Sequence, residues 1–72
     1  MSKTLELRER RNTLWEQTKA FLDNAKREGD ILSAEDAATY EKMEADIVAL
    51  GREIDILERQ AAMEMKLNLP VG

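Results

Sequence analysis

The fold is decided by residues 40–61, which read YEKMEADIVALGREIDILERQA. Apolar side chains recur there at alternating spacings of three and four residues, at Tyr40, Met43, Ile47, Leu50, Ile54, Leu57 and Ala61. This is the heptad period of a coiled coil, in which one face of a helix stays against a partner helix. The stretch therefore predicts a long helix with one apolar seam.

An earlier stretch supplies the partner for this seam. Leu7, Leu14 and Phe21 are seven residues apart, and Trp15 and Leu22 lie beside them on a helical projection. This spacing is typical of a helix that buries one broad apolar stripe. We expect that helix to span residues 4–28.

The segment between the two helices is expected to form a turn over residues 29–33. Gly29 suits the left-handed backbone position that follows a helix, because it has no Cβ. Ser33 can cap the next helix, since its hydroxyl accepts a hydrogen bond from a free backbone N–H. The second helix is predicted over residues 34–68, because Pro70 disfavours helical geometry in the residue before it.

So short a turn makes the two helices fold back on each other in an antiparallel arrangement. We therefore predict an all-α fold without strands. It is a coiled-coil-like antiparallel two-helix hairpin that forms a single domain over residues 1–72. Its seam is expected to join Leu7, Leu14, Phe21, Tyr40, Met43, Ile47, Leu50, Ile54 and Leu57.

The second helix could instead pair with its own copy. In a parallel pair, the flanks of the seam would set Glu53 of one helix against Glu58 of the other, which is a repulsive contact. In the hairpin, Arg8, Arg10 and Arg11 come near the acidic flank of the second helix. The charges therefore favour the hairpin, although exposed ion pairs contribute only ~0.2 to 1 kcal/mol each.

The composition excludes most classes of function. The chain has 72 residues, a net charge of −4, and neither Cys nor His. Disulfide frameworks, imidazole or thiolate metal sites and imidazole-based catalysis are therefore excluded, and the sequence indicates no enzyme, metal, cofactor or small-molecule substrate. The longest apolar run, residues 47–50, is far shorter than the ~20 residues that span a bilayer, so no membrane association is expected.

The basic cluster near the start of the chain has an ordinary interpretation. Residues 8–11, which read RERR, could touch nucleic acid, but Glu9 lies within the cluster and no aromatic side chain stacks there. A solvated, salt-bridged helix face is the better interpretation, and no nucleic acid is expected as a partner. Gly51 interrupts a strong helix pattern, either as a tolerated defect or to allow a close helix crossing.

Some apolar side chains remain for contacts outside the hairpin. The second helix is the longer one, so its last turns extend past the first helix and leave a Met-rich end without cover. Trp15 and Leu22 could either complete the core or anchor a neighbouring subunit. We expect copies of the chain to associate into a helical bundle. The candidate partner contacts are Trp15, Leu22, Ile56, Met63, Met65 and Leu67.

The order of several short stretches resembles the N-terminal segment of tailed-bacteriophage major capsid proteins with the Hong Kong-type shell fold. The likeness covers roughly residues 4–60. It is carried by LELRERR at 5–11, AFLDNA at 20–25, the hinge GDILSAED at 29–36, YEKMEADI at 40–47 and LGREIDILERQ at 50–60.

This resemblance implies a delta, or scaffolding, domain. Such a domain lies in the procapsid interior, is assembled in the bacterial host cytoplasm together with other capsid subunits, and is later removed by the maturation protease. The family protein continues into a shell domain, so the chain is expected to be either an excised fragment or a separate small scaffold. The alternative from another class is a stand-alone helical adaptor that binds a cellular protein through its Met-rich end.

Overall fold

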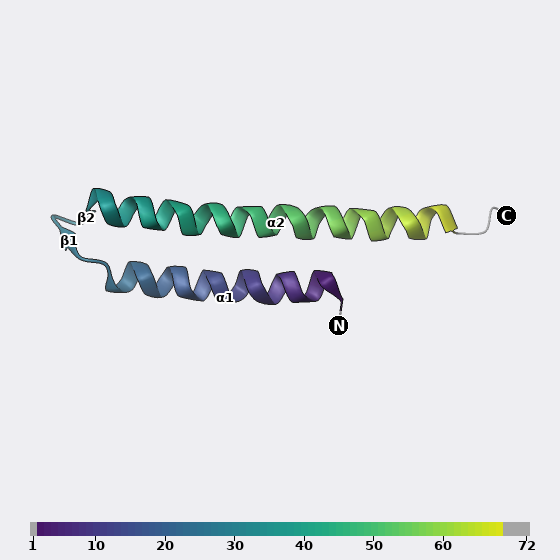
Figure 1. Cartoon of the computed structure of the whole chain (residues 1–72), viewed down its shortest axis with the longest axis horizontal. Coiled ribbons are helices and arrows are strands. Elements are labelled where there is room, and N and C mark those ends of the chain that lie inside the picture. The colour runs from purple at the N-terminus through teal and green to yellow at the C-terminus, as the bar shows by residue number, and fades with distance from the viewer. Residues whose placement is uncertain (1, 69–72) are drawn as a thin grey trace.

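The computed structural model describes residues 2–68, and two helices dominate it. Helix α1 (Lys3–Asn24) and helix α2 (Ala34–Asn68) lie side by side and antiparallel (Figure 1). The particle is a rod with principal extents of 66 × 20 × 14 Å. The predicted helical hairpin is thus confirmed. Pro70, which was expected to end the second helix, lies outside the described residues.

Each helix begins at a serine cap. The backbone N–H of Asp36 donates to the Ser33 hydroxyl oxygen at 3.0 Å, and α2 begins at Ala34 as predicted. The N–H of Leu5 donates to the Ser2 hydroxyl oxygen at 3.1 Å, so α1 has a cap of the same kind that was not predicted. Each cap satisfies one backbone donor that would otherwise lack a partner, and contributes about 1 kcal/mol.

The connection between the helices differs from the prediction. Helix α1 ends at Asn24 rather than at residue 28, and the backbone of Ala25 is already extended. Strand β1 (Arg27–Glu28) then pairs antiparallel with strand β2 (Ile31–Leu32). The expectation that the chain has no strands is therefore wrong, although each strand has only two residues.

The reason is the pair of residues at the tip. Gly29 and Asp30 both have positive φ angles, 57° and 65°. Two consecutive left-handed residues form the turn that best joins two twisted antiparallel strands, and Gly and Asp are among the residues that adopt it most readily. Gly29 is left-handed, as expected, but it serves a β-hairpin turn and does not cap a helix.

The core is a single line of side chains between the two helices. Leu7 and Ile54 are its buried apolar residues, with 6% and 2% of their surface exposed. Thr18 is completely buried, and its hydroxyl donates to the Leu14 carbonyl oxygen at 2.7 Å, which leaves no buried polar side-chain atom unsatisfied in the described part of the chain. Burying that hydroxyl is tolerated because its hydrogen bond is made within its own helix.

The register of the hairpin is visible in a contact across it. The Arg8 guanidinium forms an ion pair with the Glu58 carboxylate, which joins the start of α1 to the later part of α2. The prediction placed Arg8, Arg10 and Arg11 near the acidic flank of the second helix around Glu53, Asp55 and Glu58, and Arg8 forms an ion pair with that flank. Both side chains are about half exposed, so the pair orients the helices more than it stabilises them.

Candidate interaction surface

No group of three or more acidic side chains converges as metal ligands would within residues 2–68. None of the described helices combines the length and the apolar character of a membrane span. The hairpin surface carries exposed apolar side chains and open hollows along its helices.

All nine residues predicted for the seam lie at buried or half-buried positions. Leu22 is half-buried as well, so it belongs with the hairpin core more than with its surface. Trp15 has 44% of its surface exposed and lies at the edge of the seam, where the Lys19 ammonium is 5.6 Å from the centre of its ring. Trp15 and Leu22, which were predicted together as contact residues, therefore differ in exposure.

The hairpin has two parts that differ in cover. We call α1, together with α2 as far as Leu57, the body, and residues 58–68 the tail. In the body, the seam of α2 is covered by α1. Every residue of the tail is exposed, since α2 continues past the start of α1 (Figure 1).

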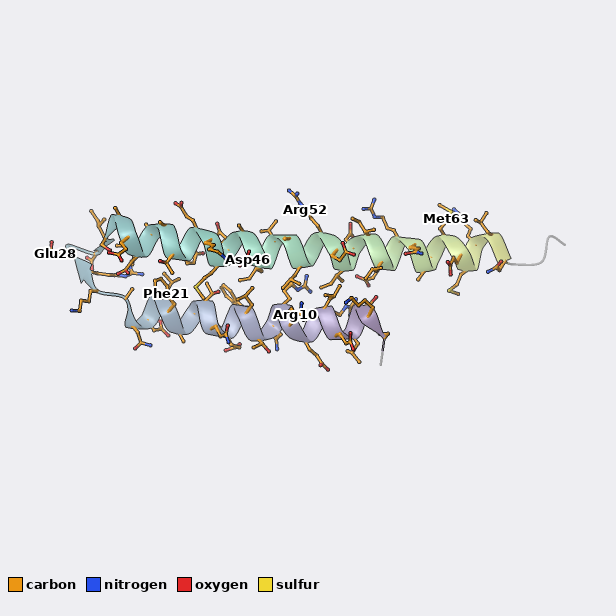
Figure 2. The ribbon with its side chains drawn as sticks, viewed as in Figure 1. Arg10, Phe21, Glu28, Asp46, Arg52 and Met63 are labelled. Carbon is orange, nitrogen blue, oxygen red and sulfur yellow. The ribbon has the colours of Figure 1, made fainter. Side chains whose placement is uncertain are left out.

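The exposed apolar residues of the tail point in two directions. Successive helical residues are turned by about 100°, so Met63 and Leu67 lie on the side away from α1, whereas Met65 continues the line of the seam. Figure 2 draws Met63 on the edge of α2 that faces away from α1. The predicted contact residues of the tail therefore belong to two different surfaces.

The side of α2 away from α1 forms an apolar stripe that continues from the body into the tail. We call this stripe the outer face. Ile56 and Met63 are 50% and 54% exposed there, and Leu67 is 75% exposed. The outer face consists of Ala45, Ala49, Ile56, Met63 and Leu67, and Arg52 lies among them on the same edge of α2 (Figure 2).

An open hollow of about 680 Å³, which we call the mid-groove, lies between the helices on one flank of the body. Leu14 and Leu50 form its apolar floor, and the small side chain of Ala49 leaves it wide on one side. Arg10 of α1 and Asp46 of α2 line it with opposite charges, and Figure 2 labels them on the two facing helices. The seam pattern did not predict this groove, because residues of both helices form it in one particular register.

The opposite flank carries Trp15. Its second hollow is lined by Trp15 and Ile47 together with the charged and polar side chains of Arg8, Glu9, Arg11 and Asn12. A Cβ at Gly51 would lie 3.4 Å from a guanidinium nitrogen of Arg11, so Gly51 leaves room beneath that side chain. The glycine therefore faces a half-buried arginine of the other helix.

Tyr40 is the group whose pKa is shifted in the described residues. Its hydroxyl donates to the Glu44 carboxylate at 3.0 Å, and that hydrogen bond, followed by the negative charge of Glu44, raises the pKa of Tyr40 above its ordinary value. Tyr40 therefore stays protonated at neutral pH. It acts as a hydrogen-bond donor at the edge of the seam.

A comparison of the chain with protein-family models, with curated proteins and with solved structures finds no match.

Proposed function

We propose that this chain is a capsid-assembly scaffold, the N-terminal delta domain of a phage major capsid protein. In this role it promotes procapsid assembly through helical self-association, inside the procapsid, and the maturation protease later removes it. The order of the stretches within residues 4–60, with the hinge at 29–36, supports this assignment to the family.

The observation that carries the self-association is the outer face of α2. A hairpin that needed only to fold would have polar residues opposite its seam, because nothing covers that side. Here Ile56, Met63 and Leu67 are each at least half exposed along one stripe. Exposed apolar side chains along one edge, even with Arg52 among them, favour a contact with another molecule.

The thin core is compatible with a scaffold that is later released. The hairpin fully buries only a few side chains, so its own core contributes little stability. Many weak contacts hold subunits together when they are tethered to one shell, because each further contact is made at high effective concentration. Such contacts are lost once the domain is cut from the shell.

The acidic charge fits the same role. A domain with a net charge of −4 that faces the interior of a procapsid would repel incoming DNA. Its removal would relieve both crowding and repulsion. If an uncleavable particle still failed to package DNA after the acidic residues had been neutralised, volume alone would account for the effect.

The direct test is to compare capsid subunits with and without residues 1–72. We expect subunits that lack this segment to form few closed procapsids, or procapsids of the wrong size, in electron micrographs of purified particles. Normal assembly without the segment would contradict the proposal. The coding sequence after residue 72 gives a second test, because the proposal requires a shell domain there.

The second candidate is a stand-alone helical adaptor for a cellular protein. It is favoured by the exposure of Met65 and Leu67, 70% and 75%, since Met-rich apolar surfaces adapt to varied partners. A stop codon directly after residue 72 would favour the adaptor, and a shell domain would favour the scaffold.

A further inference from the structure

We propose that the tail of one copy docks into the mid-groove of a second copy, with Met63 and Leu67 on the groove floor. This inference names the contact through which the proposed scaffold would self-associate, and to that extent it rests on the proposed function. The contact itself needs only the hairpin.

The tail of one copy matches the mid-groove of another in shape and in apolar character. The floor of the mid-groove is made of Leu14 and Leu50, beside the small side chain of Ala49. Met63 and Leu67 are separated by one helical turn, so they point into such a groove together when the tail lies along it. This is the arrangement in which an amphipathic helix binds a groove between two other helices.

The charges of the tail and of the mid-groove are also complementary. In the tail, Glu64 and Lys66 lie on opposite sides of the stripe that Met63 and Leu67 form, since each is turned about 80° from its centre. The mid-groove has Arg10 on its α1 side and Asp46 on its α2 side. The tail therefore has one acidic and one basic edge, and each can face a groove wall of opposite charge.

The charges also select one direction. All three helices are right-handed, so a tail that runs parallel to α1 brings Glu64 to Arg10 and Lys66 to Asp46. The reverse direction would set Glu64 against Asp46 and leave Lys66 beside Arg10, which is repulsive in both contacts. Asp46 already pairs with Lys42 of its own helix at 3.1 Å, but that pair is exposed and is therefore easily exchanged.

The contact joins two different surfaces, the tail of one copy and the groove of the other. After one docking event, each pair still has a free tail and a free groove. Heterologous contacts of this kind continue into open chains, or close into rings if the rotation permits. The expected behaviour in solution is therefore a concentration-dependent series of oligomers.

The first experiment is sedimentation velocity of the whole chain up to about 1 mM, where even contacts of ~4 kcal/mol are half formed. We expect Met63→Glu to abolish the concentration dependence and to keep the helicity. Ala62→Glu is the matched control, since it adds the same charge to the neighbouring exposed residue, which points away from the groove. An equal loss of self-association in both variants would overturn the proposal, and so would a wild type that stays monomeric at every concentration.

The second experiment uses mixing to separate a heterologous from a symmetric contact. Ala49→Glu blocks the groove and keeps the tail, whereas Met63→Glu blocks the tail and keeps the groove. Each variant alone is expected to be monomeric, and an equimolar mixture is expected to form heterodimers and nothing larger. A mixture that stays monomeric would refute tail-in-groove docking.

A charge exchange tests the direction of the tail. Glu64→Lys and Arg10→Glu should each weaken association at least threefold, and their mixture should recover it because the reversed charges meet in one of the two pairings. Failure to recover would contradict the direction. These outcomes are independent of the capsid test, since a shell domain can follow a hairpin that stays monomeric, and a self-associating hairpin can precede a stop codon.

Discussion

The body and the tail of α2 have similar composition and the same secondary structure, yet they differ in what covers them. In the body, α1 covers the seam, and Ile54 is 2% exposed. In the tail, Met65 occupies the same line of the seam and is 70% exposed. The heptad pattern therefore specifies which face of α2 is apolar. The length of α1 decides how much of that face is covered within the chain.

The largest expected effect comes from placing a charge on this line in each part. Ile54→Asp should unfold the hairpin, because a carboxylate without a partner would be buried at a cost of at least ~3 kcal/mol in a domain of small total stability. Met65→Asp, the matched change in the tail, should leave the melting temperature unchanged. Circular dichroism during thermal unfolding measures both.

The same pair of variants also tests the seam itself. If Ile54→Asp melted like the wild type, the side chain would not be buried between the helices. Ile47→Asp and Leu50→Asp should behave like Ile54→Asp, since both lie half-buried on the seam.

Much of the body could be predicted from the sequence. The predicted bounds of α2 followed from Ser33 and Pro70, and its seam followed from the heptad spacing, because caps, prolines and periods are local signals. The end of α1 could not be predicted in the same way, since residues 25–28 carry no strong helix breaker. There the left-handed turn at Gly29 and Asp30 extends the chain on both sides, and a strand of two residues is too short to show a period of two.

The surfaces were less predictable than the elements. Met63, Met65 and Leu67 were predicted as one contact site because all three extend past the first helix, although a turn of about 100° per residue sets Met65 on the opposite side of α2 from the other two. The mid-groove depends on how Arg10 and Asp46 face each other across the hairpin, which requires the register. The exposed Ile31 of the turn, 72% exposed, was not predicted because the strand that carries it was not expected. Association into a bundle stays a prediction.

Effects of intermediate size on the free energy of unfolding are expected at two glycines, Gly29 in the turn and Gly51 in the body. Gly29→Ala should destabilise the hairpin by about 1 kcal/mol, because alanine disfavours a φ of 57° although nothing lies within 4 Å of its Cβ. Gly51→Ala should stabilise it by up to about 1 kcal/mol, because its backbone is helical and its Cβ would contact Arg11 at an ordinary distance.

Urea titration of both variants gives the two free energies of unfolding. Opposite signs are the expected result. If Gly51→Ala were as destabilising as Gly29→Ala, Arg11 would be packed more tightly against α2 than the 3.4 Å distance indicates.

The smallest expected effect lies at the boundary between body and tail. A double-mutant cycle of Arg8→Ala and Glu58→Ala should give a coupling energy of ~0.2 to 1 kcal/mol, because both side chains are about half exposed. The coupling should decrease in 1 M salt, where exposed charges are screened. A coupling that is zero at low salt would place the start of α1 elsewhere along α2.

The measurement that tests the account most directly is amide hydrogen exchange of the wild type, residue by residue, at several protein concentrations. The account predicts that residues 40–57 stay protected even at the lowest concentration, because their seam is covered within the chain, and that residues 58–68 gain protection as the concentration rises. If residues 40–57 lost their protection on dilution, the seam would be covered by a second copy and the hairpin account would be wrong. If the tail stayed unprotected at every concentration, its docking to another copy would be refuted.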